Sequence, residues 1–199
     1  VDDNSPDQTQ KMIEKLQKER PKQVHLIRRK GKMGLGSAYV EGFSWGLKKN
    51  YEYLIEMDAD LSHNPEHLPE FMKALDRHHF VVGSRYVPGG GTVNWGLSRR
   101  LLSQMGSLYS RTILNLSMKD LTGGYNAWHR DVLEAIDLSK VKSEGYSFQI
   151  ELKYKALRAG FTGVEVPITF HERRSGSSKI SKSIILEAIF QVWRLKLGL

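Results

Sequence analysis

The spacing of apolar residues along the chain predicts alternating strands and helices. Apolar residues recur at helical spacing over residues 34–48, 148–158 and 182–197, and short continuous apolar runs at residues 53–57 and 80–82 are typical of buried strands. The same criteria predict three further strands, at residues 24–27, 126–128 and 163–170. They also predict the apolar faces of two further helices. The first face consists of Leu68, Phe71, Met72 and Leu75, and the second of Leu102, Met105, Tyr109, Ile113 and Leu116. This alternation predicts an α/β fold, in which a mostly parallel central sheet is covered by helices on both faces.

The two ends of the chain carry separate signals. Ser5 and Pro6 are typical of an N-cap and the first turn of a helix. Residues 1–3 resemble the end of a strand, and the chain does not open with Met. We therefore expect a main domain over residues 1–181 that is incomplete at its N-terminus and lacks its first strand. An amphipathic helix over residues 182–199 follows, and it either packs on the core or lies in a membrane interface.

Composition excludes several classes of protein. The chain is 40% hydrophobic and 26% charged, as an ordinary globular protein is. It has no cysteine, which excludes disulfides, thiolate chemistry and cysteine-based zinc sites. No apolar run approaches the ~18 residues needed to cross a bilayer. The net charge of +8 is compatible with nucleic acid, an anionic membrane or phosphorylated substrates as partners. Nucleic-acid binding also requires stacking aromatics or a recognition helix on a basic face, and we find neither pattern.

An acidic pair follows the predicted strand at residues 53–57. Asp58 and Asp60 stand one residue apart, and in open α/β sheets ligands bind beyond the carboxyl ends of strands. Carboxylate oxygens in that position suit Mg²⁺ or Mn²⁺ bridging to phosphate. The alternative is a pair of solvated turn residues, but a second acidic pair, Asp2 and Asp3, also follows a strand end and favours the metal site.

Cations downstream of the acidic pair form a second candidate feature. Arg85 follows a strand, Arg99 and Arg100 open a helix, and Arg173 and Lys179 lie in a basic loop. A guanidinium group can donate two parallel hydrogen bonds to two oxygens of a phosphate, and a helix N-terminus adds backbone N–H donors. Each cation taken alone could be an ordinary solvated charge. However, Arg85 and Arg99 flank a glycine-rich loop that could close over a ligand.

Other motifs are less specific. Residues 30–37 contain three glycines but match neither the P-loop nor the dinucleotide-binding pattern, so they form either a turn facing a nucleotide or a plain helix start. His63 and His67 follow Asp60 closely, and we assign them cap or surface roles.

Taken together in chain order, eight segments resemble one family. They are VDDNSPD (1–7), KMGLGSAY (32–39), MDADLSHNPEHLPEF (57–71), GSRY (83–86), WGLSRR (95–100), DLTGGYNAW (120–128), GYSFQIE (145–151) and VPITFHERRSGSSK (166–179). The set resembles the polyprenol-phosphate (dolichol-phosphate) mannose synthases, which are inverting GT-A glycosyltransferases of family 2. The family opens with a further strand and a P-x-Y/F-N-E motif, which this sequence lacks.

The resemblance assigns roles by motif position. Asp2, Asp3 and Lys32 are expected to bind the nucleotide, and Asp58 and Asp60 the metal and the donor diphosphate. Phosphate groups of donor and acceptor are then expected at three residues: Arg85, Arg99 and Ser103. All three are assigned to the acceptor phosphate. Loop residues are expected to close the site: Arg173, Ser178 and Lys179. Asp60, Arg85 and Arg99 are thereby the expected catalytic residues.

The resemblance also implies an activity. Mannose would pass from GDP-mannose to a polyprenyl monophosphate, with Mg²⁺ or Mn²⁺ as cofactor, at the cytoplasmic face of a membrane. Because a phosphate monoester is largely dianionic at pH 7, no general base is needed, and Glu144 is a weak candidate for one. Two alternatives remain: a polyprenyl-phosphate glucosyltransferase that uses UDP-glucose, and a non-catalytic subunit that binds a sugar nucleotide.

Overall fold

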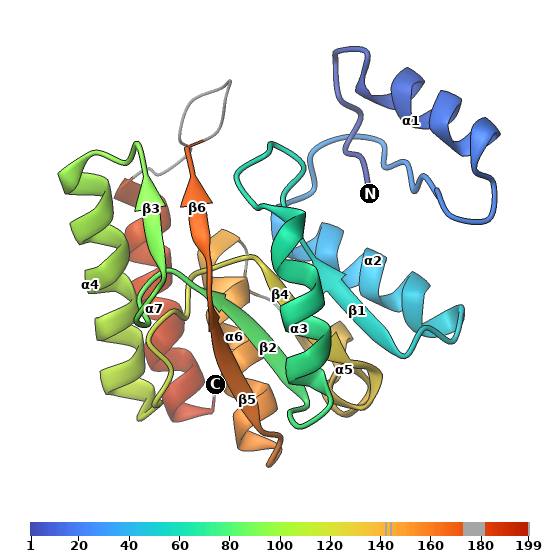
Figure 1. Cartoon of the computed structure of the whole chain (residues 1–199). Helices are drawn as coiled ribbons and strands as arrows, with labels where there is room; N and C mark the ends of the chain where they lie inside the picture. Colours follow the sequence, from blue (N-terminus) through green and yellow to red (C-terminus); the bar gives the residue numbers. More distant parts are fainter. Residues whose placement is uncertain (142, 144, 173–181, 199) are drawn as a thin grey trace.

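A four-stranded sheet lies at the centre of the molecule (Figure 1). The computed structural model describes residues 1–141, 143, 145–172 and 182–198. In spatial order the strands of the sheet are β1 (Tyr53–Glu56), β4 (Asn126–His129), β2 (Phe80–Ser84) and β5 (Gly163–Pro167). A two-stranded parallel sheet pairs β3 (Gly91–Val93) with β6 (Thr169–His171).

The central sheet is mixed, and the expectation of a mostly parallel sheet is wrong in this respect. β4 pairs antiparallel with both β1 and β2, while β2 and β5 pair parallel. β4 begins at Asn126, opposite Glu56 and Val82 near the carboxyl ends of its neighbours. The chain re-enters the sheet at that edge, so the strand must run back. A buried strand is apolar in either direction, and the sequence pattern therefore could not indicate this reversal.

Helices pack on both faces of the sheet, as expected. Seven α-helices are present in the described residues: α1 (Thr9–Glu19), α2 (Leu35–Lys48), α3 (Leu68–Leu75), α4 (Leu97–Leu114), α5 (Arg130–Ala135), α6 (Gly145–Arg158) and α7 (Lys182–Leu197). Two short 3₁₀ helices lie at Pro65–His67 and Leu138–Lys140. α3 covers one face, where Phe71 packs with Val81 of β2. Helices α2, α5 and α6 cover the other, where Phe148 packs with Phe80. Successive residues of β2 thus point to opposite faces.

Some predicted details are wrong. Met72 of α3 is exposed, because only the side of this helix that carries Phe71 and Leu75 faces the sheet. Residues 24–27 form no strand, since Arg28 makes only an isolated bridge to Asp2. Ser5 caps no helix: α1 begins at Thr9, and the Ser5 hydroxyl donates to Asp2 instead.

The predicted strand at residues 163–170 is divided between the two sheets. Pro167 ends β5, and its ring nitrogen has no hydrogen to donate. Ile168 donates its backbone N–H to Ser84 O at 3.0 Å, and the chain then continues as β6 beside β3. This change of sheet brings the end of β6 close to the loop that follows β2.

The last helix packs against the body of the molecule. α7 contacts both α4 and α6, and Val192 is buried in the core (Figure 1). Its bounds agree with the sequence prediction, while the division into two domains stays a prediction. Among the helices of the described residues, none has the length and apolar character that a membrane crossing requires.

Candidate active site

The acidic pair lies where the sequence predicted it, just beyond β1. Asp58 is half-buried, and its Oδ1 accepts a hydrogen bond from the Tyr39 hydroxyl at 3.3 Å. Asp60 Oδ1 accepts the backbone N–H of Ser62 at 3.0 Å. Leu61, which lies between Asp60 and Ser62, has a left-handed backbone with φ of 65°, which is uncommon for a residue with a side chain. The segment after β1 is therefore a tight, specifically bonded turn.

His63 is part of this site, so its assignment to a cap or surface role is wrong. It is buried, its ring stacks on Tyr125 at a centroid distance of 4.8 Å, and it lies edge-on to Phe170 at 5.2 Å. Its Nδ1 accepts the backbone N–H of Asp58 at 3.0 Å, so the hydrogen of the neutral ring is on Nε2. Burial lowers the pKa of His63 to about 4. At pH 7 the residue is a neutral support for the Asp58 backbone.

The residues present fit a hard divalent cation whose ligand sphere would be completed by substrate and water. No group of three or more His, Cys, Asp or Glu side chains suited to a metal occurs in the part of the chain that the structure describes. Asp58 and Asp60 supply carboxylate oxygens. Ser62 Oγ, in the same turn, is buried, and no residue in the described part of the chain forms a hydrogen bond with it. Mg²⁺ in particular is commonly bound by one or two carboxylates together with substrate phosphates and water.

The side chain of Arg85 is held in place by the buried carboxylate of Asp120, which lies between α4 and β4. Its Nε and Nη2 donate to the two oxygens of Asp120, each at 2.7 Å, and its backbone N–H donates to Asp120 Oδ2 at 3.0 Å. Nη2 also donates to Thr122 Oγ1 at 2.9 Å. Burial alone would raise the pKa of Asp120, but the guanidinium brings it below its ordinary value. Nη1 makes no hydrogen bond to the described residues and stays available for an anion.

Arg99 lies beside Arg85, and an indole lies against both guanidinium groups. The centroid of Trp95 is 4.1 Å from Arg99 Cζ and 5.4 Å from Arg85 Cζ. Arg99 Nη1 donates to Glu172 Oε2. Its Nε is buried and has no hydrogen-bond partner among the described residues. The two guanidinium groups are thus held in place by carboxylates and an aromatic ring.

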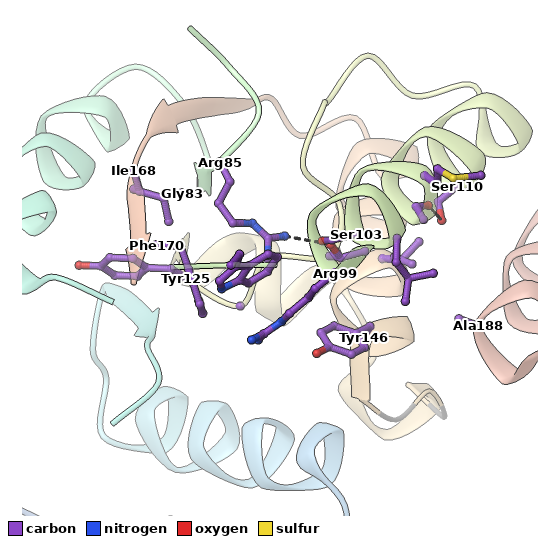
Figure 2. Close-up of a pocket in the computed structure, with 18 of the residues that line it drawn as sticks. Gly83, Arg85, Arg99, Ser103, Ser110, Tyr125, Tyr146, Ile168, Phe170 and Ala188 are labelled. Carbon is purple, nitrogen blue, oxygen red and sulfur yellow. Dashed lines mark hydrogen bonds between the residues drawn. The ribbon is translucent and has the colours of Figure 1, made fainter. Parts of the chain in front are cut away.

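A cavity of about 360 Å³ joins these features. Figure 2 shows Arg85 and Arg99 converging near its centre, with Ser103 of α4 and Tyr146 of α6 close by and Ala188 of α7 farther out. Most of its polar lining residues lie at the end that holds Arg85 and Arg99: Asp58, His63, Ser103 and Thr122; Ser110 lies farther along α4 (Figure 2). The other part is largely apolar and lies between α4, α6 and α7: Leu102, Met105, Tyr109, Ile150, Ala188 and Ile189. The apolar face predicted for the helix after residue 96 therefore partly lines the cavity.

The structure brings together some predicted site residues and leaves others apart. Asp58, Arg85, Arg99 and Ser103 line the cavity, and Asp60 lies two residues from Asp58. Arg173, Ser178, Lys179 and Glu144 fall outside the described residues. Ser103 Oγ accepts a hydrogen bond from the Tyr86 hydroxyl at 2.6 Å.

The predicted nucleotide-binding residues Asp2, Asp3 and Lys32 do not line this cavity. The Asp2 carboxylate accepts hydrogen bonds from Ser5 and Gln10, and Asp3 pairs with the buried guanidinium of Arg29. Lys32 is exposed. Binding of a nucleotide by these three residues stays a prediction.

Two buried charged residues, Glu56 and Lys153, were not predicted from the sequence as part of this region. Glu56 is buried and accepts hydrogen bonds from Asn126 at 2.6 Å and from Gln149 at 2.8 Å. Lys153 is also buried and donates to backbone carbonyls of the Asp120 turn. Asn126 and Gln149 lie in the DLTGGYNAW and GYSFQIE motifs, but nothing in the spacing of these motifs indicated that both side chains meet Glu56.

Comparison with known proteins identifies the family. The model of the family described as "Glycosyl transferase family 2" matches residues 1–137. The polyprenol monophosphomannose synthase of Mycolicibacterium smegmatis is 50% identical over 193 residues, which cover 96% of this chain and 73% of that protein. This chain belongs to glycosyl transferase family 2. The undecaprenyl-phosphate mannosyltransferase of Micrococcus luteus is 48% identical over 194 residues, or 98% of this chain and 79% of that protein.

Solved structures place this family 2 glycosyltransferase in the GT-A fold. Glucosyl-3-phosphoglycerate synthase from Mycobacterium tuberculosis, in complex with Mn²⁺, UDP and phosphoglyceric acid, matches with a TM-score of 0.67 at 14% identity, over 100% of this chain and 66% of that one. The same enzyme with Mn²⁺, UDP-glucose and phosphoglyceric acid gives a TM-score of 0.65 at 15% identity, over 96% and 66% of the two chains. The expected family and fold are thereby confirmed.

Proposed function

We propose that this glycosyltransferase transfers mannose from GDP-mannose to a polyprenyl monophosphate and inverts the anomeric carbon. One observation carries the proposal: a single cavity joins a carboxylate beyond β1, two fixed guanidinium groups and a long apolar wall. The polar end suits two phosphorylated substrates, and the apolar wall suits a prenyl chain. The two relatives that are 50% and 48% identical over the aligned residues are named as a polyprenol monophosphomannose synthase and an undecaprenyl-phosphate mannosyltransferase, which supports a mannosyl transfer to a polyprenyl phosphate.

The reaction is a single displacement. A phosphate oxygen of the acceptor attacks the anomeric carbon, an oxygen–carbon bond forms, and the bond from that carbon to the GDP diphosphate breaks with its electron pair on the leaving group. The acceptor phosphate is already largely dianionic at pH 7, so no side chain has to remove a proton. Two like-charged phosphate groups must nevertheless approach each other, and the guanidinium groups of Arg85 and Arg99 offset this repulsion.

The residues around the leaving group have a separate role. Asp58 and Asp60 would hold a Mg²⁺ or Mn²⁺ ion, which stabilises the charge that develops on the diphosphate. The structural relatives described above contain Mn²⁺. His63 supports this site through the backbone of Asp58.

The apolar outer surface of α4 and α7 supports binding at a membrane. Leu97, Leu101 and Leu108 are exposed along α4, and Phe190 and Trp193 are exposed on α7. The two helices lie side by side (Figure 1). Cationic side chains of the same helices, Arg100, Arg111, Arg194 and Lys196, suit an anionic lipid surface. Lipid acceptors reside in membranes, so this surface would bring the cavity to its substrate.

Substitution of one carboxylate tests the proposal. Asp60→Ala is expected to abolish lipid-linked mannose formation from GDP-mannose, undecaprenyl phosphate and Mg²⁺ or Mn²⁺, while the circular dichroism spectrum stays that of the wild type. The control is Asp76→Ala, which removes an exposed carboxylate outside the cavity and is expected to leave transfer intact. Transfer by Asp60→Ala at the wild-type rate would exclude the metal role. Product formation from UDP-glucose in place of GDP-mannose would reassign the donor.

A further inference from the structure

The turn at residues 119–123 carries the partners of Arg85, and side chains of two other elements hold its backbone. Glu165 of β5 accepts the backbone N–H groups of Lys119 at 2.7 Å and Asp120 at 2.9 Å. From the other side, Lys153 of α6 donates to Leu121 O at 3.2 Å and to Gly123 O at 2.8 Å. A carboxylate thus satisfies the donors of the turn, and an ammonium group satisfies its acceptors.

Lys153 occupies an unusual position for a lysine. Its exposed fraction is 0%, and burial of an ammonium group is costly unless nearby acceptors and negative charges compensate for the lost water. Burial lowers its pKa to about 8, against the opposing effects of Glu56 and Asp120. An apolar side chain of similar length would fill the same space without this cost. The charge therefore needs an explanation beyond packing.

The turn transmits the position of Lys153 to the cavity. Gly123 donates its N–H to Asp120 Oδ1 at 3.1 Å, which ties one end of the turn to the other. Asp120 and Thr122 then accept from the Arg85 guanidinium. Thr122, Gly123 and Arg85 all line the cavity. A shift of the carbonyls that Lys153 holds would move Asp120 and Thr122, and through them the Arg85 guanidinium.

We infer that Lys153 is a positioning residue, which holds the Leu121–Gly123 backbone so that Asp120 and Thr122 fix the Arg85 guanidinium toward the acceptor phosphate. The inference rests on the proposed function for the role of Arg85. It differs from a simpler explanation, in which Lys153 only neutralises the buried Glu56. The two explanations predict opposite behaviour when both charges are removed together.

Steady-state kinetics of the full chain test the inference. Lys153→Met is expected to lower kcat/KM for undecaprenyl phosphate by roughly 10- to 100-fold, since small misplacements of a positioning group have effects of that size. The KM for GDP-mannose is expected to stay within about twofold, since Arg85 is assigned to the acceptor. Arg158→Met is the control, because it removes an exposed positive charge from the same helix. Wild-type kinetics in Lys153→Met would overturn the inference.

Two combined variants separate positioning from charge balance. Glu56→Gln with Lys153→Met removes both buried charges and is expected to remain impaired, whereas recovery of the wild-type kcat/KM would reduce Lys153 to a counter-charge. In an Arg85→Met background, Lys153→Met is expected to add no further loss, because it acts through Arg85. If the double variant instead lost kcat/KM by the product of the two single-variant factors, the inference would be contradicted.

Folding is controlled separately. Each variant is assayed below its own thermal transition. If Lys153→Met alone does not unfold cooperatively, the double variant with Glu56→Gln is used instead, and wild-type kcat/KM for undecaprenyl phosphate in that double variant would overturn the inference. Failure of the proposed function is distinguishable, since the wild-type chain itself would then form no lipid-linked mannose.

Discussion

Asp120 is the residue on which the shape of the polar end depends most. Its carboxylate is fully buried and accepts three hydrogen bonds from Arg85 and one from Gly123. The sequence marked its motif but not its role, because Arg85 and Asp120 lie 35 positions apart and no local period relates them. The location of residues that share one turn, such as Asp58 and Asp60, was predictable. Residues that act through a distant partner were not.

Loss of the Asp120 carboxylate is expected to destabilise the fold strongly. Asp120→Ala would leave the Arg85 guanidinium buried and uncompensated, with an expected loss of about 3–5 kcal/mol in the free energy of unfolding. Urea denaturation followed by circular dichroism measures this loss. Glu134→Ala is the control, because it breaks the more exposed ion pair with Arg130 and is expected to have a much smaller effect. Equal losses in the two variants would contradict the account of Asp120.

The Asp2 carboxylate gives a prediction on acid stability. A hydrogen bond from the Ser5 backbone, followed by one from Gln10, lowers the pKa of Asp2 from 3.8 to about 2. A carboxyl whose pKa is lower in the folded state stabilises the fold above its unfolded pKa, here pH 3.8, and loses that contribution as the pH falls toward 2. The difference in urea midpoint between wild type and Asp2→Asn should be constant from pH 7 to 5 and shrink below pH 3.8. A difference that does not vary with pH would contradict this role.

At the scale of elements, the helices were predicted better than the strands. Residues 182–197 were predicted as a helix and form α7, since the helical period and the basic last turn are local signals. β4 was located correctly at residues 126–128 but its direction was not, because direction depends on where the loop after α4 returns to the sheet. Residues 24–27 have the composition of a strand but pair with no strand among the described residues, and only the next residue, Arg28, forms a bridge to Asp2.

The exposed apolar surface of α7 predicts a membrane-binding phenotype. Phe190→Ser is expected to lower co-sedimentation with anionic phospholipid vesicles by about tenfold or more, since burial of a phenyl ring stabilises binding by roughly 1.5–3 kcal/mol. Met12→Ser is the matched control, because Met12 on α1 and Phe190 have the same exposed fraction of 66%. Equal vesicle binding by the two variants would exclude α7 from the membrane surface.

At the scale of the whole molecule, the site is assembled from segments that are far apart in sequence. The turn after β1, the loop after β2, α4, the Asp120 turn and α6 all contribute to one cavity, and α7 closes its apolar part. Motif order was sufficient to recognise the family and hence the fold. It could not reveal that Glu172 pairs with Arg99, that His63 holds Asp58, or that Lys153 holds the turn below Arg85. Those contacts depend on how the sheet order brings loops together.

In the proposed reaction two phosphorylated substrates meet in this cavity, with the acceptor phosphate at the guanidinium groups. Transfer of radiolabelled mannose from GDP-mannose to undecaprenyl phosphate, measured for the wild type and Arg99→Ala at varied concentrations of each substrate, tests it most directly. We expect lipid-linked mannose from the wild type, and in Arg99→Ala a KM for undecaprenyl phosphate raised at least about tenfold with a nearly unchanged KM for GDP-mannose. No labelled lipid from the wild type, or a variant impaired only toward GDP-mannose, would contradict the account.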